Sequence, residues 1–143
     1  MRINDCVLVD FPKIVDARGC LSIVECHKHI PFTVQRVFYT YSFSPGAQRG
    51  GHAHYQLQEV IIPIVGNFDV KLHDGFDEKH LTLTQSHQGL YLAPLVWVEL
   101  SHFSADAVCL VLASEIYDEA SYIRNYQTFL QVARGFVNAD TVS

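Results

Sequence analysis

Short segments that alternate apolar and polar residues, or run apolar for four to eight residues, follow one another through most of the chain. In the segment FDVKLH, positions 68–73, Phe68, Val70 and Leu72 alternate with polar residues, which is the spacing of a β-strand with one apolar face. Asp74-Gly75 follows directly and predicts a hairpin turn. Further segments of this kind occupy positions 36–43, 59–65, 81–84, 89–94, 97–103 and 107–114. Regular short strands ended by turn residues predict a closed or nearly closed all-β fold.

The tail has a different pattern. Its apolar residues recur at the spacing of one helix face, with Asp118 as a predicted N-cap and Gly135 as a predicted stop. These apolar positions are Tyr122, Ile123, Tyr126, Phe129, Leu130 and Val132. The pattern predicts one C-terminal α-helix packed on the outside of the barrel.

Length and charge exclude several classes of protein. The 143 residues suit one domain, 1–143, and the longest uncharged apolar run, Val60–Val65, is far too short to span a bilayer. The beginning of the chain lacks the apolar segment of a secretory signal, so we expect a cytoplasmic protein with four free cysteines and no membrane partner. The net charge of −5, without any basic run, argues against nucleic-acid binding.

Two histidines stand two residues apart in the segment GAQRGGHAHYQLQEVIIPIVG. In a strand, His52 and His54 face the same way, with Cα atoms roughly 6.5–7 Å apart. Such a pair suits metal ligation, proton transfer or hydrogen bonding to a polar ligand. The alternative is a pair of solvent-facing histidines on an edge strand.

The spacing around this pair resembles the first sequence motif of the cupin superfamily. Gly46, His52, His54, Glu59 and Gly66 meet that motif in full. The resemblance implies a small cupin, or jelly-roll-like, β-barrel whose mouth holds the site. In metal-binding cupins both histidines and the glutamate bind a transition metal, together with a third histidine from a second motif.

The second cupin motif is incomplete in this chain. The segment GLYLAPLVWVEL supplies Gly89 and Pro94, but Val98 stands where a histidine would follow. We therefore expect chemistry without a metal. A metal site with three protein ligands stays open as the alternative.

Most of the chain, from Phe11 to Phe129, resembles the dTDP-4-keto-6-deoxyglucose 3,4-ketoisomerases of deoxysugar biosynthesis. The resemblance rests on FPKIVDARGCLSIVE, IPFTVQRVFYTY, QRGGHAH, GLYLAPLVWVEL and VLASEIYDEASYIRNYQTF. It implies a cofactor-free enzyme that moves the ketone of a dTDP-linked sugar from C4 to C3, for glycans such as lipopolysaccharide or S-layer chains. It also implies a homodimer, with an N-terminal strand exchanged between subunits. Val98, Phe38 and Pro63 depart from the family pattern.

Ketone migration through an enediol needs proton-handling groups beside two adjacent carbons. We expect His52 and His54 to be the base and its partner, without deciding which removes the C3 proton. Tyr39 and Tyr41 share one face of the aromatic strand, and a phenol there, first of all that of Tyr39, could donate to the sugar oxygens. Glu59 is expected to orient a histidine or to bind the sugar.

The remaining expected contacts are with the substrate. Arg49, Arg18 and Arg36 are candidates for holding the diphosphate on an acidic protein, and Glu99 is a weaker candidate for binding the sugar. Two other functions stay open: a metal-dependent cupin enzyme, such as a dioxygenase or sugar isomerase, and a non-catalytic module that binds nucleotide sugars. The C4 configuration of the product does not follow from the residues.

Overall fold

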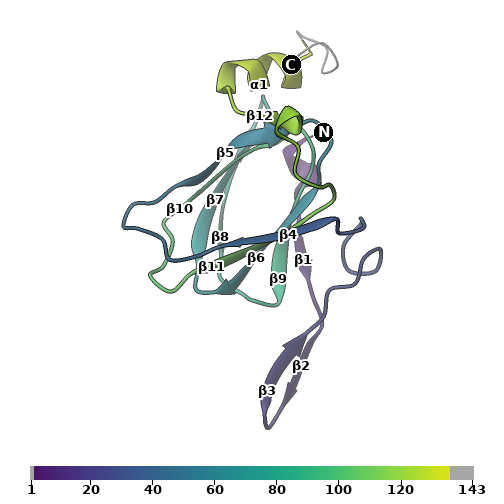
Figure 1. Ribbon diagram of the computed structural model, residues 1–143, viewed down its shortest axis with the longest axis vertical. Coiled ribbons are helices and arrows are strands. Elements are labelled where there is room, and N and C mark those ends of the chain that lie inside the picture. Colours follow the sequence, from purple (N-terminus) through teal and green to yellow (C-terminus); the bar gives the residue numbers. More distant parts are fainter. Residues whose placement is uncertain (1, 136–143) are drawn as a thin grey trace.

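The computed structural model describes residues 2–135, and two five-stranded antiparallel sheets face each other in it (Figure 1). The first sheet has the order β1 (Leu8–Asp10), β9 (Gln88–Leu92), β6 (Glu59–Val65), β11 (Val108–Ala113) and β4 (Arg36–Thr40). The second has the order β12 (Tyr122–Ile123), β5 (Arg49–His54), β10 (Trp97–Ser101), β7 (Phe68–His73) and β8 (Glu78–Leu83). The predicted all-β barrel is confirmed.

Apolar residues from both sheets fill the space between them. On β7 the side chains of Phe68, Val70 and Leu72 are buried, whereas the alternate residues are half-buried, as the alternation predicts. They meet residues such as Ile61 and Val111 of the facing sheet in one core cluster. Burial of an apolar side chain of this size contributes about 1.5–3 kcal/mol.

Pro63 lies inside β6 without disrupting it. The neighbouring strand β9 pairs with β6 only from Glu59 to Ile61, so no partner on that side needs an N–H at Pro63. On the other side, the register with β11 shifts between Val108 and Cys109, opposite Pro63. The strand therefore accommodates the proline with a bulge.

The C-terminal helix is shorter than the sequence pattern predicts. Helix α1 spans Tyr126–Ala133, and its N-cap is Asn125, whose side chain accepts a hydrogen bond from Thr128 N at 3.0 Å. The prediction of Asp118 as the N-cap of this helix was wrong. Asp118 caps the short 3-10 helix η2 (Glu119–Ser121), and strand β12 follows before α1 begins.

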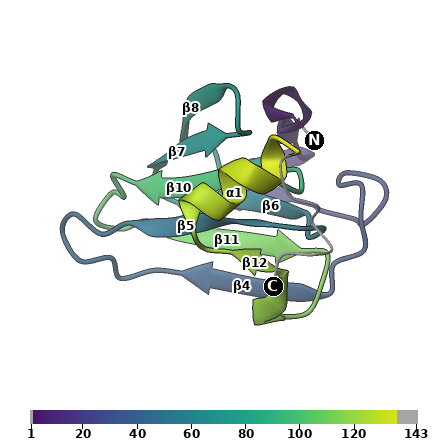
Figure 2. The same cartoon turned by 90° about the horizontal axis from the view of Figure 1, so that it is seen from above.

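The two other expectations for the helix are confirmed. Gly135 follows the end of α1 with a φ of +78°, a left-handed conformation that favours glycine. The helix lies on the outside of the barrel, across β5 (Figure 2). Phe129 and Val132 pack there against Ala53 and Trp97.

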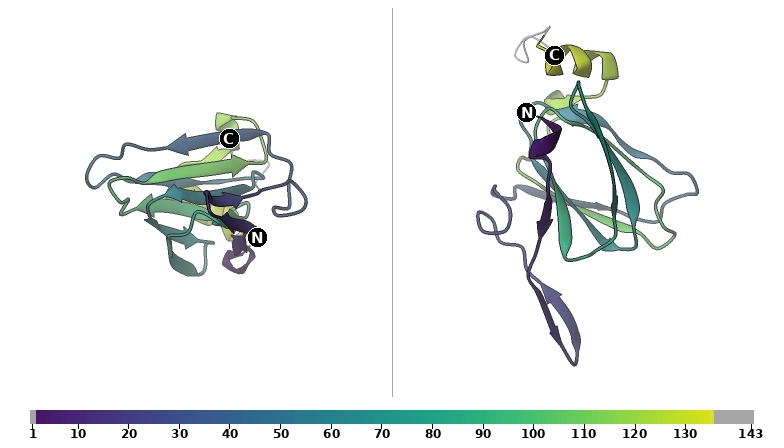
Figure 3. Two further views of the ribbon diagram at one scale, coloured as in Figure 1. Left: turned by 90° about the horizontal axis from the view of Figure 1, so that it is seen from below. Right: turned by 180° about the vertical axis from the view of Figure 1, so that it is seen from behind.

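The N-terminal segment forms a short 3-10 helix η1 (Ile3–Asp5), strand β1 and a separate hairpin of β2 (Lys13–Asp16) and β3 (Gly19–Ser22). The hairpin projects away from the barrel (Figure 3), and every residue of its two strands is exposed. Among residues 2–135, no helix has the length and apolar character needed to cross a membrane.

Asp74, in the β7–β8 turn, joins this turn to the N-terminal segment. Its side chain is almost fully buried and accepts hydrogen bonds from the backbone N–H groups of Ile3 at 2.8 Å, Phe76 at 2.9 Å and Asp77 at 2.7 Å. The predicted hairpin turn is thus confirmed, with the carboxylate as its central acceptor.

We expect Asp74→Ala to lower the free energy of unfolding by about 2–4 kcal/mol, because three backbone donors lose a charged acceptor. Urea unfolding measures this difference. Asp77→Ala is the matched control in the same turn, and its effect should stay within about 0.5 kcal/mol. Equal stabilities of the two variants would contradict this account of the turn.

Candidate active site

Strand β5 directs both histidines of the HxH pair into the barrel. The strand pairs with β10 on one side, with Val98 opposite His52, and with β12 on the other, with Tyr122 opposite His54. Ala53, between the histidines, points the other way into the cluster under α1. The two imidazole rings consequently lie side by side, with centroids 4.8 Å apart, and His54 is only 3 % exposed.

Burial makes both imidazoles neutral. Desolvation, with a contribution from Arg124, lowers the pKa of His52 to about 4, while a backbone hydrogen bond to Gly50 acts in the opposite direction. Desolvation, followed by the charges of His52 and Arg36, lowers the pKa of His54 to about 3. At neutral pH each ring therefore offers a nitrogen lone pair that can accept a proton.

Glu59, on β6 of the facing sheet, is the third titratable residue beside the two histidines. Its Oε1 lies 3.8 Å from His54 Nδ1, and burial raises the pKa of Glu59 to about 7 although the charge of Arg36 lowers it. The carboxyl group is thus poised between its protonated and ionised forms near neutral pH. It can orient His54 in either form.

Three buried polar atoms in this region have no hydrogen-bond partner among the described residues. They are His52 Nδ1, His54 Nε2 and Arg36 Nε, and within residues 2–135 no other buried side-chain nitrogen or oxygen is left unpaired. Unpaired buried polar atoms are costly and rare in folded proteins. Their concentration around one histidine pair indicates a site for a polar ligand.

A cavity of about 140 Å³ reaches this group from inside the barrel. Its wall includes His52 and Glu59 but not His54. Phe38 and Val98, the two departures from the family pattern on this side, supply apolar surface. His52 is therefore the histidine that borders the free space.

The donor atoms of His52, His54 and Glu59 also lie within 4.8 Å of one another, as the ligands of a metal ion would. Two histidines and one glutamate match, in number and type, the protein ligands of a metal site that keeps an open coordination position. Arg36 opposes this fit, since its positive charge is close enough to shift the pKa values of both His54 and Glu59. Val98, beside His52, cannot provide a fourth ligand.

Tyr122 is a neighbour of the histidines that the sequence pattern did not reveal. Its ring meets those of His52 and His54 edge-on, with centroids 5.1 and 4.3 Å apart, and Arg36 Nη2 donates to its hydroxyl at 3.5 Å. The spacing of the tail assigned Tyr122 to a helix face. The one signal for a role was that it lies in the specific segment YDEASYIRNY.

Of the three arginines expected to hold the diphosphate, two lie near the histidines and one does not. Arg36 lies in the histidine cluster, and Arg49 lines the cavity at its rim. Arg18 lies on the projecting hairpin with a side chain that is 90 % exposed, and it pairs with Asp16 at 2.8 Å. Within one chain, Arg18 is therefore not part of the site.

The structure does not bring Tyr39, Tyr41 or Glu99 to the histidines. The two tyrosines are 60 % and 58 % exposed, because the alternation of β4 directs Phe38 inward and its neighbours outward. Glu99 lies on the outer face of β10, where it accepts a hydrogen bond from Trp97 Nε1 at 3.0 Å.

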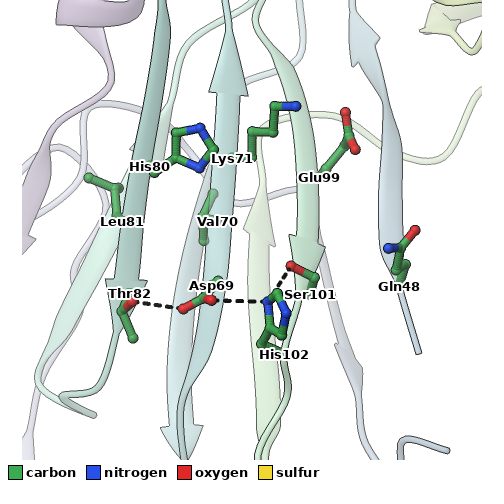
Figure 4. A pocket seen from close by; sticks show the side chains of 10 residues that line it. All are labelled: Gln48, Asp69, Val70, Lys71, His80, Leu81, Thr82, Glu99, Ser101 and His102. Atoms are coloured by element: carbon green, nitrogen blue, oxygen red, sulfur yellow. Dashed lines mark hydrogen bonds and ion pairs between the residues drawn. The ribbon is translucent and has the colours of Figure 1, made fainter. Parts of the chain in front are cut away.

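A wider hollow of about 410 Å³ lies on the outer face of β10, β7 and β8 (Figure 4). Its charged groups satisfy one another: Asp69 pairs with His102 at 3.0 Å and accepts from Thr82 at 2.7 Å (Figure 4). No buried unpaired polar atom of residues 2–135 lies there. The barrel interior is therefore the better candidate for the active site.

Comparison with known proteins gives consistent results. The family model described as "FdtA: WxcM-like, C-terminal" matches residues 4–134. The chain is 43 % identical over 122 residues to TDP-4-oxo-6-deoxy-alpha-D-glucose-3,4-oxoisomerase of Aneurinibacillus thermoaerophilus, covering 85 % of this chain and 88 % of that protein.

Solved structures of related proteins have the same fold. A histidine-to-asparagine mutant of the 3,4-ketoisomerase QdtA from Thermoanaerobacterium thermosaccharolyticum, in complex with TDP-4-keto-6-deoxyglucose, is 38 % identical, with a TM-score of 0.90 over 94 % of this chain and 97 % of that one. The WlaRB TDP-quinovose 3,4-ketoisomerase of Campylobacter jejuni is 40 % identical, with a TM-score of 0.86 over 90 % and 99 %.

The pKa values of His54 and Glu59 shift in opposite directions on folding, so the pH dependence of stability tests both shifts. A histidine whose pKa falls from 6.5 to about 3 on folding contributes stability that is lost as the pH falls below 6.5. A carboxyl whose pKa rises from 4.5 to about 7 gains stability as the pH falls from 7. The two contributions oppose each other between pH 6.5 and 4.5.

We expect His54→Asn to flatten the loss of stability between pH 6.5 and 4.5 by about 2 kcal/mol, and Glu59→Gln to steepen it by a similar amount. Urea unfolding of both variants and the wild type at the two pH values measures the slopes. Because the predicted changes have opposite signs, a general destabilisation by mutation cannot produce both. Slopes that change in the same direction would refute the assigned shifts.

Proposed function

Since the chain belongs to the FdtA (WxcM-like, C-terminal) family, we propose that it is a 3,4-ketoisomerase of TDP-linked sugars in deoxysugar biosynthesis. It converts TDP-4-keto-6-deoxyglucose into a TDP-3-keto-6-deoxyhexose by proton transfer. The observation that carries the mechanism is the pair of neutral, buried imidazoles with unpaired nitrogens beside a cavity.

His52 is the base in this mechanism, because it is the histidine whose side chain lines the cavity. Nδ1 of this ring has no hydrogen-bond partner among the described residues, and it is the proton acceptor of the mechanism. Nδ1 takes the proton from C3, the C3–H electrons form a C3=C4 double bond, and O4 takes up the negative charge and then a proton. Loss of the O3 proton and protonation of C4 give the 3-keto sugar.

This sequence of steps needs no redox cofactor, because the substrate oxidises C3 and reduces C4 within one molecule. His54 acts as the partner of His52 and is oriented by Glu59, 3.8 Å away. Arg36 contributes positive charge close to the developing oxyanion. Arg49, at the rim of the cavity, is placed to hold the diphosphate.

A homodimer with exchanged N-terminal segments fits the surface of the chain. The β2–β3 hairpin exposes Ile14, Val15 and Leu21, and the edge strand β4 exposes Tyr39 on its outer face. Exposed apolar surface and an unpaired sheet edge are typical of an interface. In the dimer, the hairpin of one chain carries Arg18 to the barrel of the other, where it binds the diphosphate.

The set His52, His54 and Glu59 supports a second candidate function, a metal-dependent cupin enzyme, because its donor atoms converge. A non-catalytic nucleotide-sugar-binding module would use the same cavity without turnover. Cytoplasmic location stays a prediction, and the free cysteines of the described chain agree with it.

We expect His52→Asn to reduce turnover by about 10²–10⁴-fold while the fold is retained, because the substitution removes the base. NMR of the sugar in deuterated water follows the reaction, and deuterium at ring carbon C4 of the product marks ketone migration. The wild type should keep full activity in EDTA. Activity that EDTA abolishes and a divalent metal restores would favour the metal-dependent cupin, and binding without turnover would favour the non-catalytic module.

The exchanged dimer predicts complementation between two impaired chains. In a heterodimer of Arg18→Ala and His52→Asn chains, one barrel has its own His52 together with Arg18 from the partner subunit. Such a heterodimer, purified with two different affinity tags, should show about half of the wild-type activity. The two homodimeric variants are the controls. If Arg18 acts within its own chain, neither barrel of the heterodimer has both residues, and its activity stays below that of the Arg18→Ala homodimer.

A further inference from the structure

The short strand β12 brings a tyrosine hydroxyl to the histidine pair, in a position that the mechanism above does not use. We propose that the hydroxyl group of Tyr122, held by Arg36, donates a hydrogen bond to O4 of the sugar and stabilises the negative charge of the enediolate. The proposal rests on the ketoisomerase function. It assigns to this chain a donor that comes from the tail rather than from the aromatic strand β4.

The local structure directs Tyr122 inward. Asp118 caps η2 by accepting a hydrogen bond from Ala120 N at 3.1 Å, and the chain then extends into β12. Because Tyr122 pairs with His54 and Ile123 pairs with Ala53, the alternation of the strand separates their side chains. Ile123 is buried under α1, and Tyr122 faces the histidines.

The contacts of Tyr122 leave its own proton available. Its ring lies edge-on against both imidazoles, and its hydroxyl oxygen accepts from Arg36 Nη2 at 3.5 Å. A phenol that accepts from a guanidinium group can still donate its O–H to another acceptor. Arg36 also keeps Nε without a partner, so positive charge and a free donor lie beside the phenol.

A second arginine lies over the ring of the tyrosine. The guanidinium of Arg124 lies 4.3 Å from the centre of the Tyr122 ring, and Glu119 pairs with Arg124 at 2.5 and 2.9 Å. Tyr117 donates to the same carboxylate at 2.5 Å. This arrangement fixes the ring before the substrate arrives, which is the condition under which a donor stabilises a transition state most effectively.

The tyrosine of β4 and the one that follows this strand cannot take this role within the same barrel. Tyr39 and Tyr41 point outward, and Phe38, which lines the cavity, has no hydroxyl. Thr40 lines the cavity as well and is the competing hydroxyl. It lies opposite the buried Cys109 in the pairing of β4 with β11, and the variant Thr40→Val is therefore part of the test.

The step is balanced without another reactant. His52 removes the C3 proton, the C3–H electrons form the C3=C4 double bond, and the C4=O π electrons move to O4. The hydroxyl of Tyr122 donates to O4 as this charge develops. Because the contact strengthens only as O4 becomes negative, its loss lowers kcat more than it weakens substrate binding.

The test compares Tyr122→Phe with Tyr126→Phe, which removes a hydroxyl from a tyrosine on α1, outside the barrel, where its ring packs edge-on against Trp97. We expect Tyr122→Phe to lower kcat about 10²-fold, as for the loss of one oxyanion donor, with KM changed less than about 3-fold. Tyr126→Phe should stay within about 2-fold of the wild type. Melting temperatures establish that both variants fold.

A substrate deuterated at C3 separates a donor from a packing residue. If Tyr122 stabilises the enediolate, its loss raises the barrier to proton removal, and the primary isotope effect on kcat in Tyr122→Phe is as large as in the wild type or larger. A smaller isotope effect, or a kcat equal to that of the wild type, overturns the proposal. A loss of kcat in Thr40→Val but not in Tyr122→Phe also overturns it and identifies Thr40 as the donor.

These outcomes are distinct from a failure of the proposed function. If the wild type does not isomerise TDP-4-keto-6-deoxyglucose, the ketoisomerase function fails, and the role of Tyr122 fails with it. If the wild type is active and Tyr122→Phe is equally active, only the role of Tyr122 is refuted.

Discussion

The pairing of β5 between β10 and β12 is the constraint on which the site depends. It sets which face of β5 looks into the barrel, and it does so from both sides: Val98 lies opposite His52, and Tyr122 lies opposite His54. If the pairing of β5 with either neighbouring strand shifted by one residue, Ala53 would face the barrel interior and both imidazoles would lie under α1. The packing of Ala53 beneath Phe129 makes that shift costly, because the space there accommodates only a small side chain. The helix outside the barrel thus helps to keep the histidines inside it.

Burial gives the two imidazoles their neutral form and also makes them weak bases, since the pKa of His52 falls to about 4. The substrate itself can correct this weakness. In the proposed mechanism, negative charge develops on O4 in a region where the positive charges of Arg36 and Arg124 lower the histidine pKa values. Nearby negative charge favours an imidazolium, so in this mechanism the developing oxyanion would raise the proton affinity of His52. The proposed base would thus be activated by the substrate on which it acts.

Much of the fold could be predicted from the sequence, because strand alternation is a local property. The segment FDVKLH became β7 with the expected buried face, and EVIIPIV became β6 despite Pro63. The alternation of residues along a strand does not determine which of its two faces points into the barrel, however. Tyr39 and Tyr41 share a face as predicted, yet that face is the outer one, since the packing of Phe38 against the core decides the matter. Tyr122 could not be found in this way, because a strand of two residues has no period and its position depends on a long-range pairing with β5.

The cavity is divided between a polar side and an apolar side, and the proposed mechanism uses both. Glu59 and His52 present the titratable groups to which that mechanism assigns roles in proton transfer, whereas Val98 and Phe38 present only hydrocarbon. An apolar wall excludes water from the face of the sugar ring, which strengthens each hydrogen bond on the opposite side. Exclusion of water also limits the exchange of protons with bulk solvent while the enediol exists. In the proposed mechanism, the apolar side chains of Val98 and Phe38 thus leave proton transfer to the histidine pair and its immediate neighbours.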